Sequence, residues 1–234
     1  MADNEAILLK EQENEEIKPL LGDIKKQNIA YRFVKRLVDI IGGLVGIVIL
    51  IPMSLIIWMV EVLKKENDGP LFYKQVRVGK NGKSFKVYKY RSMCVNADEK
   101  LKEYLKENDK ARKEFKKYHK LKCDPRITKV GKVLRATSLD EFPQLINVLK
   151  GDMSLVGPRP VTDEEVEAYG NLKQKFLSVK PGLTGYWQVN GRSNTEYDDR
   201  VKMELYYVDN ASLILDLKIL LKTLIVVIKK EGAC

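Results

Sequence analysis

The sequence predicts a small α+β protein that is mainly helical and anchored to a membrane by one inserted helix. The first observation is an uncharged run of 21 residues from Ile40 to Val60, which as a helix is about 31 Å long and matches a bilayer core. The second is a pair of strand-like segments on either side of Asn81 and Gly82, which predicts a β-hairpin. The third is helical periodicity in the later segments.

Charge and cysteine content restrict the class of protein. The 234 residues carry a formal net charge of +10, although residues 1–30 hold an excess of acids. A basic body implies an anionic partner, which is nucleic acid, anionic lipid or a phosphate-bearing substrate. Residues 1–30 are polar and poor in aromatic side chains, which predicts a mobile leader. The three widely spaced cysteines predict free thiols in a reducing compartment.

The membrane-inserted segment is predicted to occupy residues 31–65. Pro52 lies near the middle of its uncharged run and removes a backbone hydrogen bond, and Ser54 is close enough to help repair the break. Basic residues flank the run on both sides, whereas a simple span concentrates them on the cytoplasmic side. This symmetry favours a re-entrant helix bent at Pro52, with both ends on one side. A kinked single span is the alternative on these residues alone.

Residues 66–234 are predicted to form the main domain, which begins with the hairpin. Lys89 and Arg91 follow where its second strand ends, within reach of a phosphate. Residues 97–122 are highly charged and have few apolar positions, which predicts a solvated helix or pair of helices. Residues 211–230 are rich in Leu, Ile and Val but interrupted by charges, which predicts an amphipathic helix in the membrane interface.

Two adjacent carboxylates, Asp140 and Glu141, lie at an apparent helix start. Apolar residues recur there at i, i+3, i+4 and i+7 and comprise Phe142, Leu145, Ile146 and Leu149. Ser138 and Glu141 have the spacing of a capping box, whereas Pro143 favours an N-cap at Asp140. Either start places both carboxylates in the first turn, which favours ionised carboxylates and can receive a phosphate. Taken alone, the pair is more typical of an ordinary helix cap.

Two later segments have the composition of ligand-binding loops. Pro158 and Pro160 hold Arg159 in a stiff extended geometry, which lowers the entropy lost when the arginine grips a phosphate. The run KPGLTGYWQVNGRS contains Trp187, Gln188 and Arg192, and we expect it to be a loop. It either lines a small-molecule pocket or packs as an ordinary loop whose tryptophan side chain is buried in the core.

These motifs together resemble one family. KVYKYRSM, the segment from DPRITKVGKV through SLDEFPQL to GPRP, and KPGLTGYWQVNGR are similar to those of the bacterial sugar transferases, which are monotopic phosphoglycosyl transferases. The resemblance covers the chain from about Tyr31 to the end. It implies a small cytoplasmic domain that transfers a sugar-1-phosphate from a UDP-sugar to polyprenol (undecaprenyl) phosphate, releases UMP and initiates capsule, exopolysaccharide or O-antigen synthesis.

The resemblance also implies roles for individual residues. Asp140 is expected to be the nucleophile that forms an aspartyl phosphosugar, and Glu141 its partner at a Mg²⁺ ion, which Asp140 can also reach. The phosphate-binding arginines fall on Arg135 and Arg159. The break in the re-entrant membrane helix falls on Pro52. Lys89, Arg91, Pro158, Trp187, Gln188 and Arg192 are further candidates for contacts with phosphate or substrate.

The expected partners are a UDP-sugar, with UDP-glucose or UDP-galactose favoured, polyprenol phosphate and membrane lipid. The resemblance places the protein in the bacterial inner membrane with its domain on the cytoplasmic face, and leaves a homo-oligomer open. Nucleic acid is not expected as a partner, because the basic residues are dispersed and the sequence contains no recognised nucleic-acid-binding motif. The alternative function is a membrane-tethered protein that binds anionic ligands or acts as a scaffold in a glycan-assembly complex.

Overall fold

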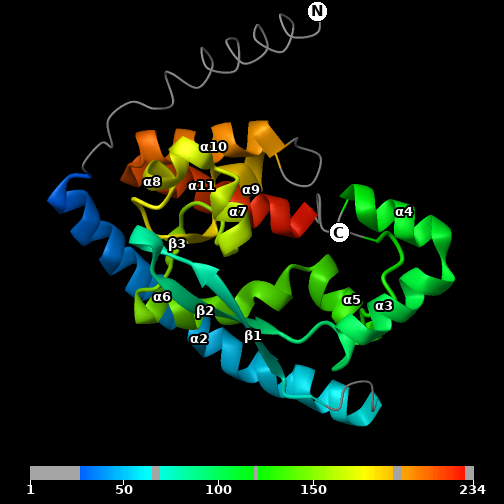
Figure 1. The fold of residues 1–234 in the computed structure, drawn as a ribbon. Coiled ribbons are helices and arrows are strands. Elements are labelled where there is room, and N and C mark those ends of the chain that lie inside the picture. Colours follow the sequence, from blue (N-terminus) through cyan, green and yellow to red (C-terminus); the bar gives the residue numbers. More distant parts are fainter. Residues whose placement is uncertain (1–26, 65–68, 119–120, 192–196, 230–234) are drawn as a thin grey trace, which may run out of the picture.

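The computed structural model describes residues 27–64, 69–118, 121–191 and 197–229. Most of these residues are helical, as predicted, with two small sheets (Figure 1). The longer helices and the strands are α2 (Ile29–Lys64), β1 (Phe72–Val78), β2 (Ser84–Tyr90), α3 (Ala97–Glu107), α4 (Asp109–Tyr118), α5 (Lys129–Ala136), α6 (Leu145–Lys150), β3 (Ser154–Val156), β4 (Gly182–Thr184), α10 (Tyr197–Asn210) and α11 (Leu213–Lys229). The shorter helices are α7 (Asp163–Glu167), α8 (Lys173–Phe176) and α9 (Tyr186–Asn190), and three 3-10 turns are η2 (Lys80–Gly82), η3 (Leu139–Gln144) and η4 (Gly170–Leu172).

Helix α2 runs along one side of the molecule (Figure 1) and is long and apolar enough to cross a membrane. Asn28 caps its first turn by accepting a hydrogen bond from the Ala30 amide at 3.0 Å. Its buried positions lie one or two helical turns apart and comprise Asp39, Gly43, Gly46, Leu50, Ile57 and Glu61. One face therefore packs on the body, whereas the opposite face leaves large apolar side chains exposed.

The proline in α2 lies within one continuous helix. Ser54, two residues later, donates its hydroxyl to the Leu50 carbonyl at 2.7 Å, and its oxygen lies 2.6 Å from the Tyr90 hydroxyl on β2. Ser54 thus ties the Pro52 region to the hairpin. The re-entrant path of this helix stays a prediction.

Helix α6 packs directly against α2 because glycines at the contact leave room for leucine side chains. A Cβ atom added at Gly43 would lie 2.6 Å from the Leu149 side chain, and one at Gly46 would lie 2.4 Å from that of Leu145. Arg36 of α2 also donates to the carbonyls of Val148 and Leu149 at 2.7 Å each. These are among the carbonyls that a helix end leaves unpaired, so the arginine caps α6.

The predicted hairpin is confirmed as the antiparallel pair β1–β2, with Phe72 opposite Tyr90 and Val78 opposite Ser84. Asn81 and Gly82 adopt positive φ angles of 58° and 77° in its turn. These residue types tolerate that conformation best, which is why the pair marked the turn.

A second sheet, which the sequence analysis did not predict, joins β3 and β4 in parallel, with Ser154 opposite Gly182 and Val156 opposite Thr184. The segment KPGLTGYWQVNGRS is therefore not a simple loop, because it contains β4 and helix α9. Both strands are three residues long, too short for an alternating pattern to be recognised.

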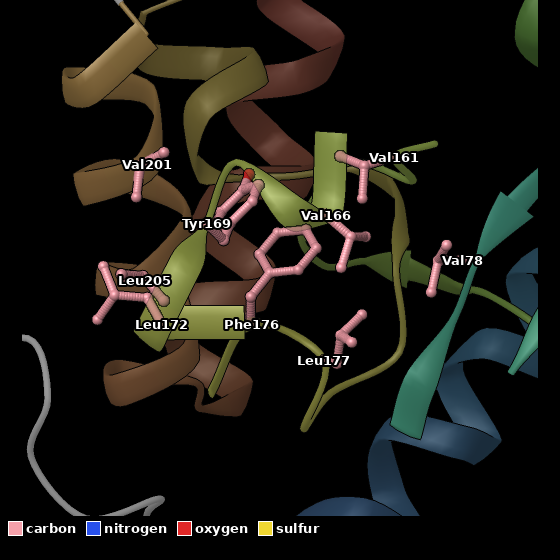
Figure 2. Packing of buried hydrophobic residues seen from close by; sticks show 9 residues of the cluster. All are labelled: Val78, Val161, Val166, Tyr169, Leu172, Phe176, Leu177, Val201 and Leu205. Atoms are coloured by element: carbon pink, nitrogen blue, oxygen red, sulfur yellow. The ribbon is translucent and has the colours of Figure 1, made fainter. Parts of the chain in front are cut away.

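One core cluster lies between α10, the short helices and the hairpin (Figure 2). Tyr169 and Phe176 meet at its centre with ring centroids 4.2 Å apart, and Val78 of β1 and Val161 join it from the hairpin side (Figure 2). This core holds the segment after β3 in place, because Val78 donates its amide to the Val161 carbonyl at 2.9 Å.

The remaining predictions concern the ends of the chain and the charged stretch. Of the charged stretch 97–122, the described residues 97–118 contain a pair of helices, α3 and α4, as expected. Helix α11 exposes an apolar stripe at Ile214, Leu217, Leu221 and Leu224, as predicted for an amphipathic helix. The leader predicted for residues 1–30 lies almost wholly outside the described residues.

Candidate active site

The two carboxylates lie in the 3-10 turn η3, directly before α6. Ser138, at its start, has a left-handed backbone with φ 57° and makes no capping hydrogen bond through its side chain. The predicted capping box is therefore wrong, and so is an α-helical first turn. Pro143 has no amide hydrogen to donate, and the chain bends instead through the left-handed residue and short-range bonds such as Glu141 N–H to the Ser138 carbonyl, 3.4 Å.

Three predicted cations surround this turn. Lys89, at the end of β2, donates to Glu141 Oε1 at 2.7 Å, and a guanidinium nitrogen of Arg159 lies 3.5 Å from the same oxygen. Arg135, at the end of α5, donates from Nε to Ser92 Oγ at 2.9 Å, and its charge acts on Asp140. Three segments, the end of β2, the end of α5 and the chain after β3, thus bring cations to one pair of carboxylates.

The two carboxylates have pKa values that are shifted in opposite directions. Burial raises the pKa of Glu141, but Arg159 and Lys89 outweigh burial and bring that pKa down to about 2. Burial and the neighbouring charge of Glu141 raise the pKa of Asp140, with Lys89, Arg135 and Arg159 opposing them. Glu141 is therefore a fixed anion, whereas Asp140 is the more basic of the two groups.

The carboxylate of Asp140 makes no hydrogen bond or ion pair with any of the residues that the structure describes. Its side chain is half-buried, so the carboxylate remains open to a ligand. The α-helical start that was expected to favour an ionised Asp140 is absent, and three nearby cations instead oppose the rise in its pKa.

Tight backbone packing fixes the segment that carries Arg159. A Cβ atom at Gly157 would lie 2.5 Å from the Lys180 carbonyl oxygen, and the Gly182 amide donates to the Pro158 carbonyl at 2.7 Å. The Arg159 amide in turn donates to Glu204 Oε1 at 3.1 Å. The predicted stiffness of GPRP thus has a second source, because β4 and α10 clamp the segment that the prolines straighten.

The other predicted contacts are placed differently. Arg91 donates from Nε to the Pro70 carbonyl at 2.9 Å and lies over the Tyr73 ring, so its contacts are at the base of the hairpin. Trp187 lies under the Arg200 guanidinium, 4.7 Å from the ring centroid, and Gln188 lies beside Gly185 at the start of α9. Arg192 lies outside the described residues.

Sequence analysis missed a buried charged cluster next to this site. Arg77 of β1 pairs with Glu165 at 3.0 Å, and Arg200 lies 3.7 Å from the same carboxylate. Glu204 is fully buried, and burial raises its pKa to about 7. The signal was present, since Arg200 and Glu204 are four residues apart and share one face of α10.

Four buried polar atoms of this neighbourhood have no hydrogen-bond partner within the described part of the chain, namely Tyr169 OH, Trp187 Nε1, Arg200 Nε and Glu204 Oε2. An unpaired buried polar group costs about 1–3 kcal/mol. Such groups are usually satisfied by water or a ligand, so this region is suited to a polar ligand.

The carboxylates have the donor chemistry that Mg²⁺ prefers. Both cations of Glu141 contact Oε1, which leaves its Oε2 and the Asp140 carboxylate available. Among the residues that can be described, no three Asp, Glu, His or Cys side chains form a complete metal site. A metal here would therefore take further ligands from water and substrate phosphates, as Mg²⁺ commonly does.

Comparison with known proteins decides the family. The family profile described as "Bacterial sugar transferase" matches residues 30–230. The chain belongs to the bacterial sugar transferase family. In this bacterial sugar transferase the matched region runs from α2 to the end of α11 and includes Lys89, Arg135, Asp140, Glu141 and Arg159.

Several curated relatives carry specific names. The chain is 48% identical over 202 residues to the undecaprenyl-phosphate galactose phosphotransferase of Salmonella typhimurium, covering 86% of this chain and 42% of that protein. It is 42% identical over 199 residues to the exopolysaccharide production protein ExoY of Sinorhizobium fredii, covering 85% and 87%. The third is the UDP-N-acetylgalactosamine-undecaprenyl-phosphate N-acetylgalactosaminephosphotransferase of Aeromonas hydrophila, 36% identical over 209 residues, covering 87% and 45%.

This bacterial sugar transferase thus spans less than half the length of some relatives and most of another. The shared region contains the whole carboxylate and cation site.

Proposed function

We propose that the protein transfers a hexose-1-phosphate from a UDP-sugar to undecaprenyl phosphate and so initiates the synthesis of a capsule, exopolysaccharide or O-antigen type glycan. The observation that carries this proposal is an unpaired, half-buried Asp140 beside a Glu141 that two cations hold ionised. The names of the relatives support the same chemistry, since they specify phosphotransfer to undecaprenyl phosphate.

In the first step, an oxygen of the Asp140 carboxylate forms a bond to the phosphorus that bears the sugar. The bond from that phosphorus to the UMP oxygen breaks, and UMP leaves with the electron pair. In the second step, an oxygen of undecaprenyl phosphate attacks the same phosphorus. The aspartyl–phosphorus bond then breaks, which regenerates Asp140 and yields a lipid-linked diphosphosugar.

The opposite pKa shifts of the two carboxylates support different roles for them in the reaction. Asp140 is the more basic group and has no competing partner, as a nucleophile requires. Arg159, Lys89 and Arg135 face the same turn, where they would stabilise the phosphate oxygens as charge shifts during transfer. Glu141 and Asp140 are the residues that would hold Mg²⁺, which would supply further neutralisation of the phosphate oxygens.

The donor sugar is proposed to lie towards α9 and α10. Trp187 provides an aromatic surface there, and the unpaired polar atoms of Arg200 and Glu204 are available nearby. Relatives named for galactose support UDP-galactose among the two donors favoured by the sequence, which are UDP-galactose and UDP-glucose.

The membrane location is part of the proposal. Helix α2 exposes apolar side chains on the face that points away from the body, which supports insertion of that face into lipid. We place the protein in the inner membrane with the catalytic domain on the cytoplasmic face, where nucleotide sugars are made available.

Trapping the intermediate tests the covalent step. With a UDP-sugar labelled on the sugar and no undecaprenyl phosphate, the wild-type chain should release about one UMP per active site and retain the label. Asp140→Asn should remain folded by circular dichroism and lose both signals, whereas Asp152→Asn, a control carboxylate at the C-terminal end of α6, should retain them. The absence of a UMP burst from wild-type protein would exclude the two-step route.

The competing proposal is a catalytically idle scaffold or anionic-ligand-binding protein. It predicts salt-sensitive binding of anions with no UMP release from any UDP-sugar. A panel of UDP-sugars in the UMP assay separates the two proposals and identifies the donor.

A further inference from the structure

A cavity of about 520 Å³ lies beside the first turns of α2. It is lined by α2, the hairpin turn, the strand β3 and the segment before β4. Asp39, the lining residue of α2 nearest to Leu50, lies about 17 Å along the helix from it, given the helical rise per residue. Leu50 belongs to the cluster against which Phe142 packs. The cavity is therefore separate from the carboxylate site.

Of the residues that the structure describes, five cations and one anion line this cavity. Two of the cations are engaged elsewhere, since Lys35 pairs with Asp216 at 2.7 Å and Arg36 caps α6. Asp39 accepts hydrogen bonds from Ser154 and from the Leu155 amide.

The other three cations, Arg32, Lys80 and Lys180, have no ion-pair partner within the described ranges. Burial and the charge of Arg32 lower the pKa of Lys80, and burial and the charge of Arg36 lower that of Lys180. Both lysines are thus held in an environment of excess positive charge, which an anion would relieve.

The cavity also opens onto the apolar face of the membrane helix. Ile29 and Phe33 line it and remain 81% and 72% exposed. Cations next to an exposed apolar surface at the entry of a membrane helix lie where lipid head groups are found. A ligand that fits has a phosphate for the cations and an acyl chain for the apolar rim.

We propose that this cavity binds the phosphate head group of an anionic bilayer phospholipid, with Lys80 and Lys180 as its main contacts and Arg32 at the rim. The lipid is not the acceptor of the transfer reaction, because the cavity is remote from Asp140. It fixes the N-terminal end of α2 at the depth of the head groups and ties the hairpin turn to the membrane surface. The cations of the cavity would bind a phosphate group, which is present both in phospholipids and in soluble phosphate esters.

Native mass spectrometry of the detergent-solubilised full chain tests the assignment. Phosphatidylglycerol should bind roughly tenfold more tightly than phosphatidylcholine with the same acyl chains, because head-group charge differs between them. Lys80→Gln combined with Lys180→Gln should weaken phosphatidylglycerol binding by roughly tenfold and leave phosphatidylcholine binding unchanged. The matched control, Lys83→Gln with Lys86→Gln, removes the same charge from exposed positions of the hairpin and should change affinity less than twofold.

Circular dichroism checks that both double variants fold. Equal affinity for phosphatidylglycerol in the cavity variant and the control would overturn the proposal. Competition by glycerol 1-phosphate at concentrations similar to those of phosphatidylglycerol would overturn the lipid assignment and assign the cavity to a soluble phosphate ester instead. Neither result depends on transferase activity.

Discussion

Asp140 and Glu141 are neighbours in sequence, but their surroundings differ. Two cations contact Glu141 and lower its pKa. Burial and the negative charge of Glu141 raise the pKa of Asp140. Two groups with opposite pKa shifts in one site are typical of groups with different tasks. The geometry favours Glu141 as the permanent electrostatic anchor and Asp140 as the reacting group.

Glu204 gives a prediction at the residue scale. Its pKa is raised to about 7 by burial, above the ordinary carboxyl value, so the folded state binds the extra proton below neutral pH. The resulting stability is fully present near pH 4 and is lost as pH rises through 7, by on the order of 3 kcal/mol at most. Glu204→Gln keeps an acceptor for the Arg159 amide and should remove this dependence.

The measurement is the melting temperature in detergent micelles between pH 5 and 8. Wild-type protein should lose stability across this range relative to Glu204→Gln, whose melting temperature should be the higher at pH 8. Glu167→Gln, at an exposed position of α7, serves as the control and should follow the wild type. Parallel curves for wild type and Glu204→Gln would contradict the assignment of the pKa to Glu204.

At the scale of elements, the short parallel sheet β3–β4 determines where Arg159 lies. Gly157, just after β3, is packed against the backbone of β4, so a side chain there has no space. Gly157→Ala should destabilise the protein by about 1–3 kcal/mol, the usual range for overpacking, and should displace Arg159 from Glu141. We expect a lower melting temperature and a loss of transfer activity that exceeds the loss of folded protein.

Gly42→Ala is the matched control for this variant. A Cβ atom there meets only the end of the flexible Leu155 side chain, which can move aside. Activity per folded molecule should be close to the wild-type value. If Gly157→Ala behaves in the same way as Gly42→Ala, the clamp on Arg159 has no function.

The elements that could be predicted from sequence are those with a strong local signal. The uncharged run predicted α2, and Asn81–Gly82 predicted the hairpin turn. The β3–β4 sheet could not be predicted, because its three-residue strands are stabilised by pairing across a long stretch of chain rather than by a local pattern. The local conformation at Ser138 was also missed, since a left-handed residue there depends on the turn that follows it.

The same distinction applies to the site. Lys89, Arg135 and Arg159 were predicted from their types and from family resemblance, and the structure brings them around Asp140 and Glu141. Arg77 and Glu204 were missed because burial of a charged side chain is a property of tertiary packing. Arg91 has a suitable position in sequence, but its contacts lie at the base of the hairpin.

For the whole molecule, the decisive feature is that α2 never separates from the body. Its buried positions extend from Asp39 to Glu61, and its 36 residues would be about 54 Å long if straight, far more than a bilayer core of about 30 Å. Full insertion across the bilayer would require this helix to leave its contacts with the domain. The arrangement favours insertion from one side.

Cysteine labelling tests this topology. In a chain without its three native cysteines, Ala6→Cys and Lys64→Cys should both react with a membrane-impermeant reagent only from the cytoplasmic side. Ala136→Cys, an exposed position at the end of α5, provides the reference for the cytoplasmic face. Labelling of Ala6→Cys and Lys64→Cys from opposite sides would establish a true span.

The link between the two ends of the fold has a consequence for biosynthesis. Lys35 of α2 is held by Asp216 and the Tyr207 hydroxyl, and its ion-pair partner lies 181 residues later. At 5–20 residues per second, a ribosome needs roughly 10–40 s to reach that partner. During this interval the lysine has no Asp216 to pair with, and its charge is free to attract the nascent helix to acidic head groups. Membrane capture of α2 would therefore precede its docking on α11, and the ion pair would close last.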